Sequence, residues 1–359
     1  MSDTAARDDH DARQQGVALI RASKAYEDDR PAYCWLLLLT TLALWGLALT
    51  AVLLVEPWPM KILAGFIAGL IQSRLFIFYH DALHGAIFRK RRVAQFLMSA
   101  FGWYSLSVRS VWQETHDFHH QHNTKLSTSS IGSYVTVSTD QARKMSRWQR
   151  FQYRAIRNGI TMVLGGITVF LFGLSWTAFK RNPRKHWQAP LAALTFIAIV
   201  VAAVMTLGWA NGLCLVVVPS ATMMMVGAYL FYAQHNFPEV KLQRREEWNF
   251  ADAAMHGSSF FKMSPMMHWF TGNIGYHHVH HLNHRIPFYN LPKAMAEMPE
   301  LQNPGTTSWS LKDIWACLRC FAWDWDEARM LTSDETFGNR YSDDEDAALT
   351  TAARVETAA

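Results

Sequence analysis

Three clusters of histidine carry the chemistry that this sequence predicts. The last of them, at residues 276–284, reads Y-H-H-V-H-H-L-N-H and places His277, His280 and His281 at positions i, i+3 and i+4. On an α-helix this spacing puts three imidazoles on one face, whereas His278 lies about 100° around the helix. Imidazole is the commonest metal ligand among side chains. The cluster therefore predicts one part of a metal site.

Two earlier clusters provide the rest of a ligand set. His80 and His84 form an i, i+4 pair in H-D-A-L-H, and H-D-F-H-H repeats the i, i+3, i+4 spacing with His116, His119 and His120. One H-x-x-x-H is weak and can be accidental or structural, but three such boxes in one chain are not expected by chance. These imidazoles exceed what one ion needs, because zinc takes four ligands and octahedral sites take six. The set predicts two metal ions.

The composition indicates a membrane protein that is all helical. Half of the 359 residues are hydrophobic, with 15 Trp and 21 Phe. Stretches long and apolar enough to span a bilayer are expected at about 33–55, 61–79, 190–209 and 212–233. The net charge is +5, and basic runs beside apolar segments favour anionic lipid over nucleic acid as a partner. The four cysteines are too few and too scattered for a disulfide scaffold.

The basic residues orient these spans. Four adjacent cations at 89–92 mark the cytoplasmic side. If 159–179 also crossed the membrane, the third box and the basic linker 180–185 would lie outside, away from the first two boxes. We therefore expect 159–179, and the short apolar segment 93–108, to be interfacial or re-entrant. This leaves four transmembrane helices in two hairpins, with every box in a cytoplasmic helical cap.

The polar ends flank one long central unit. Residues 1–31 are expected to be a cytoplasmic segment without a signal peptide, and residues 331–359 a disordered tail. Residues 32–330 would form the single domain that carries the spans and the histidines.

Three further residues are candidates near the metals. His235 ends the last apolar stretch at a depth like that of His80, so it is either a ninth ligand or an interfacial cap, and we favour the ligand. Asp81 and Asp117 each follow the first histidine of a box. A carboxylate in this place can orient a metal-bound imidazole through its second nitrogen, or can be a solvated acid. His122, His256, His268 and His284 have no helical partner in a box and are expected to be structural.

The boxes, their order and their place around two apolar hairpins resemble the membrane-bound fatty acid desaturases. The run W-F-T-G-N-I-G-Y-H-H-V-H-H-L at 269–282, followed by R-I-P-F-Y-N-L, is similar to bacterial acyl-lipid desaturases of the Δ12/omega-6 type. So are E-W-N-F-A-D-A-A-M-H-G-S-S-F-F-K at 247–262 and Y-R-A-I-R-N at 153–158. The resemblance covers roughly residues 30–330.

This resemblance implies a chemistry and a set of partners. Two irons would activate O2 and remove two hydrogens from an acyl chain of a membrane lipid. The ligands of these irons would be His80, His84, His116, His119, His120, His277, His280 and His281, with His235 as the ninth. Asn273 matches an asparagine that reaches iron through water in some members. A separate electron donor is implied, and the basic surface suits an acidic one such as ferredoxin. The location would be the cytoplasmic membrane of a bacterium.

Two other functions remain open. The same scaffold could hydroxylate or ketolate a lipid such as a carotenoid or an alkane, in which case the product would retain oxygen. A membrane metal carrier would need polar residues through the midplane of the spans. Among charged residues, only Arg74 lies well within these apolar stretches, near the inner end of the second, which weighs against a carrier.

Overall fold

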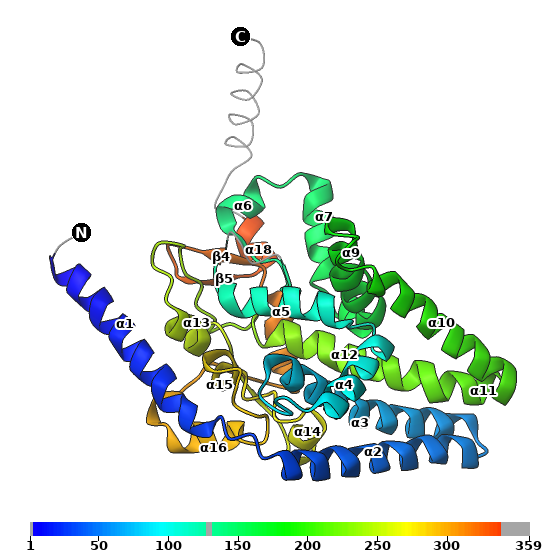
Figure 1. Ribbon diagram of the computed structural model, residues 1–359. Coiled ribbons are helices and arrows are strands. Elements are labelled where there is room, and N and C mark those ends of the chain that lie inside the picture. Colours follow the sequence, from blue (N-terminus) through cyan, green and yellow to red (C-terminus); the bar gives the residue numbers. More distant parts are fainter. Residues whose placement is uncertain (1–2, 127–130, 339–359) are drawn as a thin grey trace.

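The computed structural model describes residues 3–126 and 131–338 and is mostly helical. Within these residues, four helices are long and apolar enough to cross a membrane: Pro31–Leu54 (α2), Trp58–His84 (α3), Gln188–Leu207 (α10) and Trp209–Ala233. The last of these consists of α11 (Trp209–Gly212), a π-helical turn and α12 (Val218–Ala233). They extend together to one side, and the shorter elements gather at their other end (Figure 1). Each of the four expected apolar stretches lies mainly within one of these helices.

Helix α3 is the centre of the apolar part, packing against α2 on one side and α12 on the other. The α3–α12 contact is close because Gly69 has no side chain there: a Cβ atom on it would lie 2.6 Å from the carbonyl oxygen of Pro219. Small residues of this kind allow helices in a membrane to approach backbone to backbone. Gly85 ends α3 directly after His84 with a left-handed φ of 67°, which fixes where the first histidine box stops.

The two segments expected at the membrane surface are irregular or one-sided helices. Helix α4 (Arg92–Tyr104) buries Ala94 and Met98 and exposes Val93 and Phe96. The stretch 159–179 forms α8 (Gly159–Val163), a π-helix (Gly166–Trp176) and the start of α9 (Thr177–Arg181), and it lies against α12. An apolar face that stays exposed beside long apolar helices suits the lipid interface.

The remaining helices form a layer beyond the ends of α3 and α12, and α1 lies along its edge (Figure 1). They are α1 (Asp3–Ser23), α5 (Arg109–His122), α6 (Thr139–Arg143), α7 (Arg147–Ile156), α13 (Phe250–His256), α14 (Pro265–Phe270), α15 (His277–Leu282), α16 (Leu291–Glu297), α17 (Leu311–Arg319) and α18 (Ser333–Phe337). Helix α18 lies at the start of the expected tail, of which residues 339–359 are outside the described residues.

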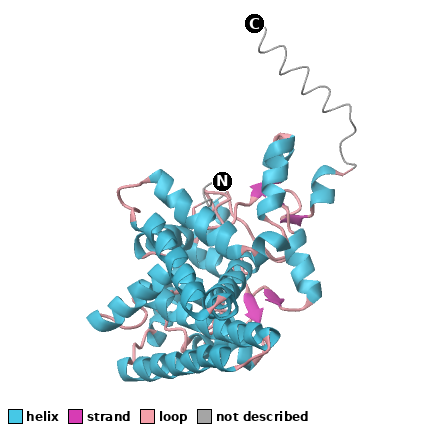
Figure 2. Cartoon of the chain, turned by 90° about the vertical axis from the view of Figure 1, so that its right-hand side faces the viewer, coloured by secondary structure: helices cyan, strands magenta, loops and turns pink. Residues whose placement is uncertain are grey.

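Two small sheets correct the expectation of an all-helical chain (Figure 2). Strand β2 (Phe260–Lys262) pairs in parallel with β3 (Thr306–Ser308), and β4 (Ala322–Asp324) lies between β1 (Val137–Ser138) and β5 (Arg329–Leu331). Strands of two or three residues are too short to leave an alternating pattern in the sequence. They join the carboxyl-terminal part of the layer to the segments that carry the histidines.

Arg74 connects this layer to the apolar helices. Its Nη1 donates a hydrogen bond of 2.7 Å to the carbonyl oxygen of Trp269, and its guanidinium carbon lies 4.7 Å from the centre of the Trp269 ring. A cation stacked on an aromatic ring and bonded to a carbonyl can be buried without a carboxylate partner. The contact holds α14 against α3.

Candidate metal centre

Each histidine box lies on a helix that ends near the same point. His80 and His84 occupy the last turn of α3, while His116, His119 and His120 occupy the last turns of α5. The third box forms α15, a helix of six residues. His235 follows the end of α12, where its backbone N–H still bonds to the carbonyl of Tyr232.

The structure brings these nine histidines together in two groups that could each hold a metal ion. The first histidine group is His80, His84, His116, His120 and His280, and the second is His119, His235, His277 and His281. Within each group the candidate ligand nitrogens lie within 4.8 Å of one another. Helices α5 and α15 contribute to both groups, because three imidazoles on one helical face fan out over two neighbouring points.

The imidazole nitrogens of each group converge on one small region. In the first group the Nε2 atoms of His80 and His116 are 2.9 Å apart. In the second, Nε2 of His235 lies 2.9 Å from that of His277 and 3.0 Å from that of His119. Burial lowers the pKa of His235 to about 4, and it lowers the pKa well below the ordinary value for His116, His119, His120, His277, His280 and His281. The rings are therefore neutral near pH 7.

Hydrogen bonds on the far side of the rings decide which nitrogen faces inward. Nδ1 of His235 is 2.9 Å from the carbonyl oxygen of Gly257, which can only accept, so Nδ1 carries the proton and Nε2 presents a lone pair. Nδ1 of His80 likewise donates to Asp81 at 2.9 Å. Nε2 of His84 is buried without a hydrogen-bond partner among the described residues. Converging lone pairs and an unpartnered buried nitrogen fit a pair of metal cations.

Asp81 is held as an orienting carboxylate, whereas Asp117 is not placed that way. Asp81 is buried, and its second oxygen accepts a hydrogen bond of 2.7 Å from the backbone N–H of Phe288. The side-chain amide of Asn273 donates to the carbonyl of the same Phe288 at 3.0 Å. The R-I-P-F-Y-N-L run thus fixes both residues beside the third box. Asp117 is exposed on α5.

The other histidines that the sequence set apart lie outside the two groups. His278 is fully buried, and its Nε2 donates to the carbonyl of Leu301 at 3.2 Å. His256 pairs with Asp252 on α13, and His122 stacks on Phe118. His268 lies beside Phe260 and Tyr276. The ring of His284 lies 4.6 Å from that of His84, so it borders the first group without belonging to it.

Two contacts around the second group were not foreseen from the sequence. The hydroxyl of Ser133 lies 2.6 Å from Nδ1 of His119, and the carbonyl of Gly257 bonds to His235. Ser133 belongs to a Ser/Thr-rich segment that carries no distinguishing pattern, and a backbone carbonyl has no signal in the side-chain sequence. Only the fold brings these atoms to the imidazoles.

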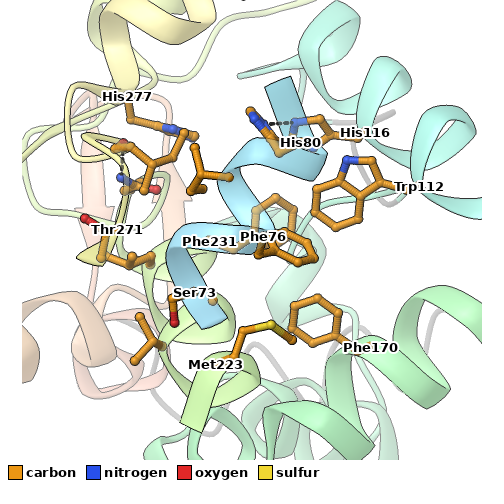
Figure 3. A pocket seen from close by; sticks show the side chains of 16 residues that line it. Ser73, Phe76, His80, Trp112, His116, Phe170, Met223, Phe231, Thr271 and His277 are labelled. Atoms are coloured by element: carbon orange, nitrogen blue, oxygen red, sulfur yellow. Dashed lines mark hydrogen bonds between the residues drawn. The ribbon is translucent and has the colours of Figure 1, made fainter. Parts of the chain in front are cut away.

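An apolar cavity runs from both histidine groups down between the long helices. His80, His116 and His277 lie at one end, and Ser73, Met223 and Phe170 at the other (Figure 3). Apart from Gln234 and Thr271, the rest of its walls is apolar or aromatic, with Phe76, Ile77, Trp112, Val226, Leu230, Phe231 and Ile274 among them. A cavity of this kind excludes water and suits a hydrocarbon chain whose carbons approach the histidines.

Known proteins resemble this chain over most of its length. The family model for fatty acid desaturases matches residues 56–311. A fatty acid desaturase of Bacillus subtilis is 31% identical over 272 residues, which are 76% of this chain and 75% of that protein. The sn-1 oleoyl-lipid 12-desaturase of a Picosynechococcus species is 24% identical over 75% of this chain and 77% of its own. A chloroplastic omega-6 fatty acid desaturase of Brassica napus is 23% identical, over 71% of this chain and 58% of its own.

The match includes every residue of the two histidine groups and three of the four long apolar helices, because α2 ends before the matched residues begin. The four apolar helices and the family together support a membrane protein. The chain belongs to the fatty acid desaturase family, and it is an oxidoreductase that acts on fatty acids.

Proposed function

We propose that this protein introduces a cis double bond into an acyl chain of a membrane lipid, using O2 and two electrons at a centre of two iron ions. The observation that carries the proposal is the apolar cavity, which touches His80 and His116 of the first group and His277 of the second. A hydrocarbon chain in it would pass beneath both groups. A metal carrier would instead need a polar path through the apolar helices.

The two histidine groups would each hold one iron. Five imidazoles are available to the first and four to the second, and a histidine-rich shell with room for further ligands suits iron. The two irons, when bound, would reduce O2 and supply the oxidant that an unactivated C–H bond requires. Asp81 would orient His80, and the Gly257 carbonyl would hold His235 in the tautomer that binds a metal.

The overall reaction needs electrons and protons from outside the substrate. A –CH2–CH2– segment, O2, two electrons and two protons give –CH=CH– and two water molecules. The cavity walls would hold the chain so that one pair of carbons meets the histidines, which makes the choice of position a matter of rigid placement. Phe76, Phe170 and Phe231 are among the large side chains that would limit its path.

The electrons would come from a separate acidic protein such as a ferredoxin. Exposed basic residues at the end of α6 and on α7 support this, among them Lys144 directly after α6, and Arg147 and Arg154 on α7. Opposite charges steer such encounters and raise their rate. We place this surface, both termini and both histidine groups on the cytoplasmic face of a bacterial membrane.

Lipid analysis of a host that expresses the chain tests the proposal. We expect new monounsaturated or diunsaturated acyl chains in membrane lipids, absent when His116 and His280 are both changed to Ala. A product that retains oxygen would favour a hydroxylase or ketolase instead. Metal analysis of the purified protein should give two irons per chain, and one zinc without iron would contradict the proposed centre.

A further inference from the structure

A second hollow lies on the outside of the apolar helices, on the side of α14. It is an open groove of about 850 Å³. The apolar part of its lining comes from α3, α12 and the segments around β2 and β3, and consists of Phe66, Leu70, Met225, Val226, Met263, Met267 and Trp309. Its polar part is Lys262, Ser264, Ser308 and Ser310. The groove thus combines an apolar floor with hydroxyl groups and one cation.

Only a thin wall separates this groove from the cavity under the histidines. Val226 lines both hollows. Met263 lines the groove, and its sulfur accepts a hydrogen bond of 3.4 Å from the hydroxyl of Thr271, which lines the cavity. A methionine side chain is flexible and adapts to what it contacts. A shift of one or two side chains would therefore join the groove to the cavity.

The surroundings of the groove face lipid. Met266 on α14 is 65% exposed, and Leu311 at the start of α17 is 84% exposed. Both lie within three residues of groove-lining side chains, and exposed large apolar residues beside long apolar helices suit a bilayer. The Arg74–Trp269 contact holds α14 in place, so this side of the groove is fixed to α3.

Lys262 gives the groove a charge preference. It is exposed at the end of β2, where it lies opposite Ser308 in the parallel pair. A lysine can rest its methylenes on apolar surface while its ammonium reaches polar groups at the interface. Such a cation attracts the anionic phosphate of a lipid headgroup. The hydroxyl of Ser308 donates to the carboxylate of Asp313, and the hydroxyl of Ser310 caps α17. Among the described residues that line the groove, Lys262 is the charged one.

We propose that this groove is a lateral entrance at which a phospholipid of the surrounding membrane is held. Its phosphate binds at Lys262, and its acyl chain passes between Val226 and Met263 into the cavity beneath the histidines. The inference rests on the proposed desaturation and specifies its substrate: an acyl chain still attached to a membrane phospholipid, rather than a thioester delivered by a soluble carrier.

Variants of the wall test the entrance. Val226→Phe and Met263→Trp add bulk where the groove meets the cavity, and Met266→Trp is a matched control on exposed surface beside it. In vesicles of phosphatidylglycerol with a chemical reductant, both wall variants should convert phospholipid acyl chains about ten- to hundred-fold more slowly. Their iron content should stay at the level of the unchanged protein. Because Val226 is buried in the core, Val226→Phe is expected to lower the melting temperature, and rates are therefore compared per iron-loaded protein. The control should keep its rate.

Cross-linking tests the site without relying on turnover. Phosphatidylglycerol with a photoreactive group near its headgroup should label residues 262–267 and 308–310, several-fold less in Lys262→Gln and undiminished in Lys262→Arg. Unchanged rates in both wall variants, or labelling that Lys262→Gln does not reduce, would overturn the inference. So would conversion of a soluble acyl thioester but not of phospholipid. Absence of any unsaturated product from the unchanged protein would instead refute the proposed function, and the cross-linking result would still stand.

Discussion

His235 occupies a position that the box spacing alone does not define. It stands past the end of α12, without a histidine three or four residues away, yet its Nε2 lies 2.9 Å from that of His277 and 3.0 Å from that of His119. Its Nδ1 is tied to the Gly257 carbonyl, so the ring is held with its lone pair toward the second histidine group. A histidine that only caps a helix at the membrane interface would need neither the approach to His119 and His277 nor the bond to the Gly257 carbonyl.

Changing His235 to Ala should therefore remove iron and activity while the protein still enters the membrane. The second group would keep three imidazoles, and a lost ligand or its support commonly lowers metal affinity by about ten- to hundred-fold or more. Iron per chain and lipid products are the measurements. His256→Ala is the control, because His256 is paired with Asp252 on exposed surface of α13. Full iron in His235→Ala would show that His235 is not a ligand.

His278 should behave as a structural residue rather than as a ligand. Helical phase predicts that it points away from the metals, and it lies outside both groups, fully buried and bonded to Leu301. We expect His278→Ala to lose roughly 2–4 kcal/mol of stability, from a cavity and an unpaired carbonyl. Its folded fraction should keep normal iron per chain, as measured by melting in detergent and by metal analysis.

A second substitution at position 278 distinguishes a structural role of His278 from a role as a metal ligand. His278→Gln keeps an N–H donor for the Leu301 carbonyl and should recover part of the stability. If instead His278→Ala lost as much iron as His280→Ala does, the third box would not act as the simple helix of α15.

At the scale of elements, a buried arginine ties three segments to the end of α12. Arg157 follows α7, and its guanidinium donates to the carbonyl of Val135 at 2.7 Å, to the side-chain oxygen of Asn236 at 2.6 Å and to the carbonyl of Cys320 at 2.9 Å. Asn236 is the neighbour of His235. The planar fork of an arginine can serve three acceptors at fixed angles, which a lysine cannot.

Arg157→Met should lower both stability and iron content. The change leaves three buried acceptors without this donor, at about 1–3 kcal/mol for each that stays unsatisfied. It also frees the turn that presents His235. The matched control is Arg154→Met one turn earlier, where the side chain is exposed and bonds to Ser333, and a change within about 0.5 kcal/mol is expected. Equal melting temperatures for the two variants would refute the structural role of Arg157.

The elements show which parts of the site could be read from the sequence. Helical spacing identified the boxes on α3, α5 and α15, because ligands on one face repeat at i, i+3 and i+4. It could not identify Ser133 or the Gly257 carbonyl, which reach the imidazoles through tertiary contacts. The long apolar helices were equally readable, whereas the short strands and the π-helix between Gly166 and Trp176 were not. Periodicity predicts the residues that share one face of a helix or strand, and it predicts few of the contacts between two elements.

At the scale of the whole molecule, the buried neutral histidines make stability depend on pH. In the unfolded chain an imidazole takes up a proton as the pH falls through about 6.5. In the folded protein the pKa is lowered to about 4 for His235, His278 and His284, and burial is the main cause. Between these pH values the unfolded state binds more protons, so stability is lost as the pH falls.

The melting temperature in one detergent should therefore decrease from pH 7.5 to pH 5.5. Each such histidine contributes up to about 1.4 kcal/mol per pH unit once the pH is below its unfolded value. Protonation also competes with metal binding, which acts in the same direction. His278→Gln removes one titrating group and should show a shallower decrease. A melting temperature that rises toward pH 5.5 would contradict this account.

A contact near the end of α9 supports the proposed number of membrane spans. Nη2 of Arg181 lies 2.6 Å and Nζ of Lys185 lies 2.5 Å from the carboxylate of Glu114, and Nε2 of His186 lies 3.2 Å from it. Glu114 is on α5, two residues before His116. These ion pairs support the proposal that the segment between α9 and α10 lies on the histidine side of the membrane, although it follows the apolar stretch 159–179. The proposed four crossings would satisfy both this contact and the basic loop at 89–92.

Labelling of single cysteines should reveal this arrangement in cells. Arg184→Cys and Lys90→Cys introduce exposed thiols in the two basic loops, and Trp209→Cys introduces one in the turn after α10, where Trp209 is 69% exposed. The native cysteines Cys34, Cys214, Cys317 and Cys320 are buried and should react little. A membrane-impermeant maleimide applied to intact spheroplasts should label Trp209→Cys alone, and applied to inside-out vesicles it should label the other two. If Arg184→Cys reacted from outside, 159–179 would have to cross the membrane, and the ion pairs with Glu114 could not form in the cell.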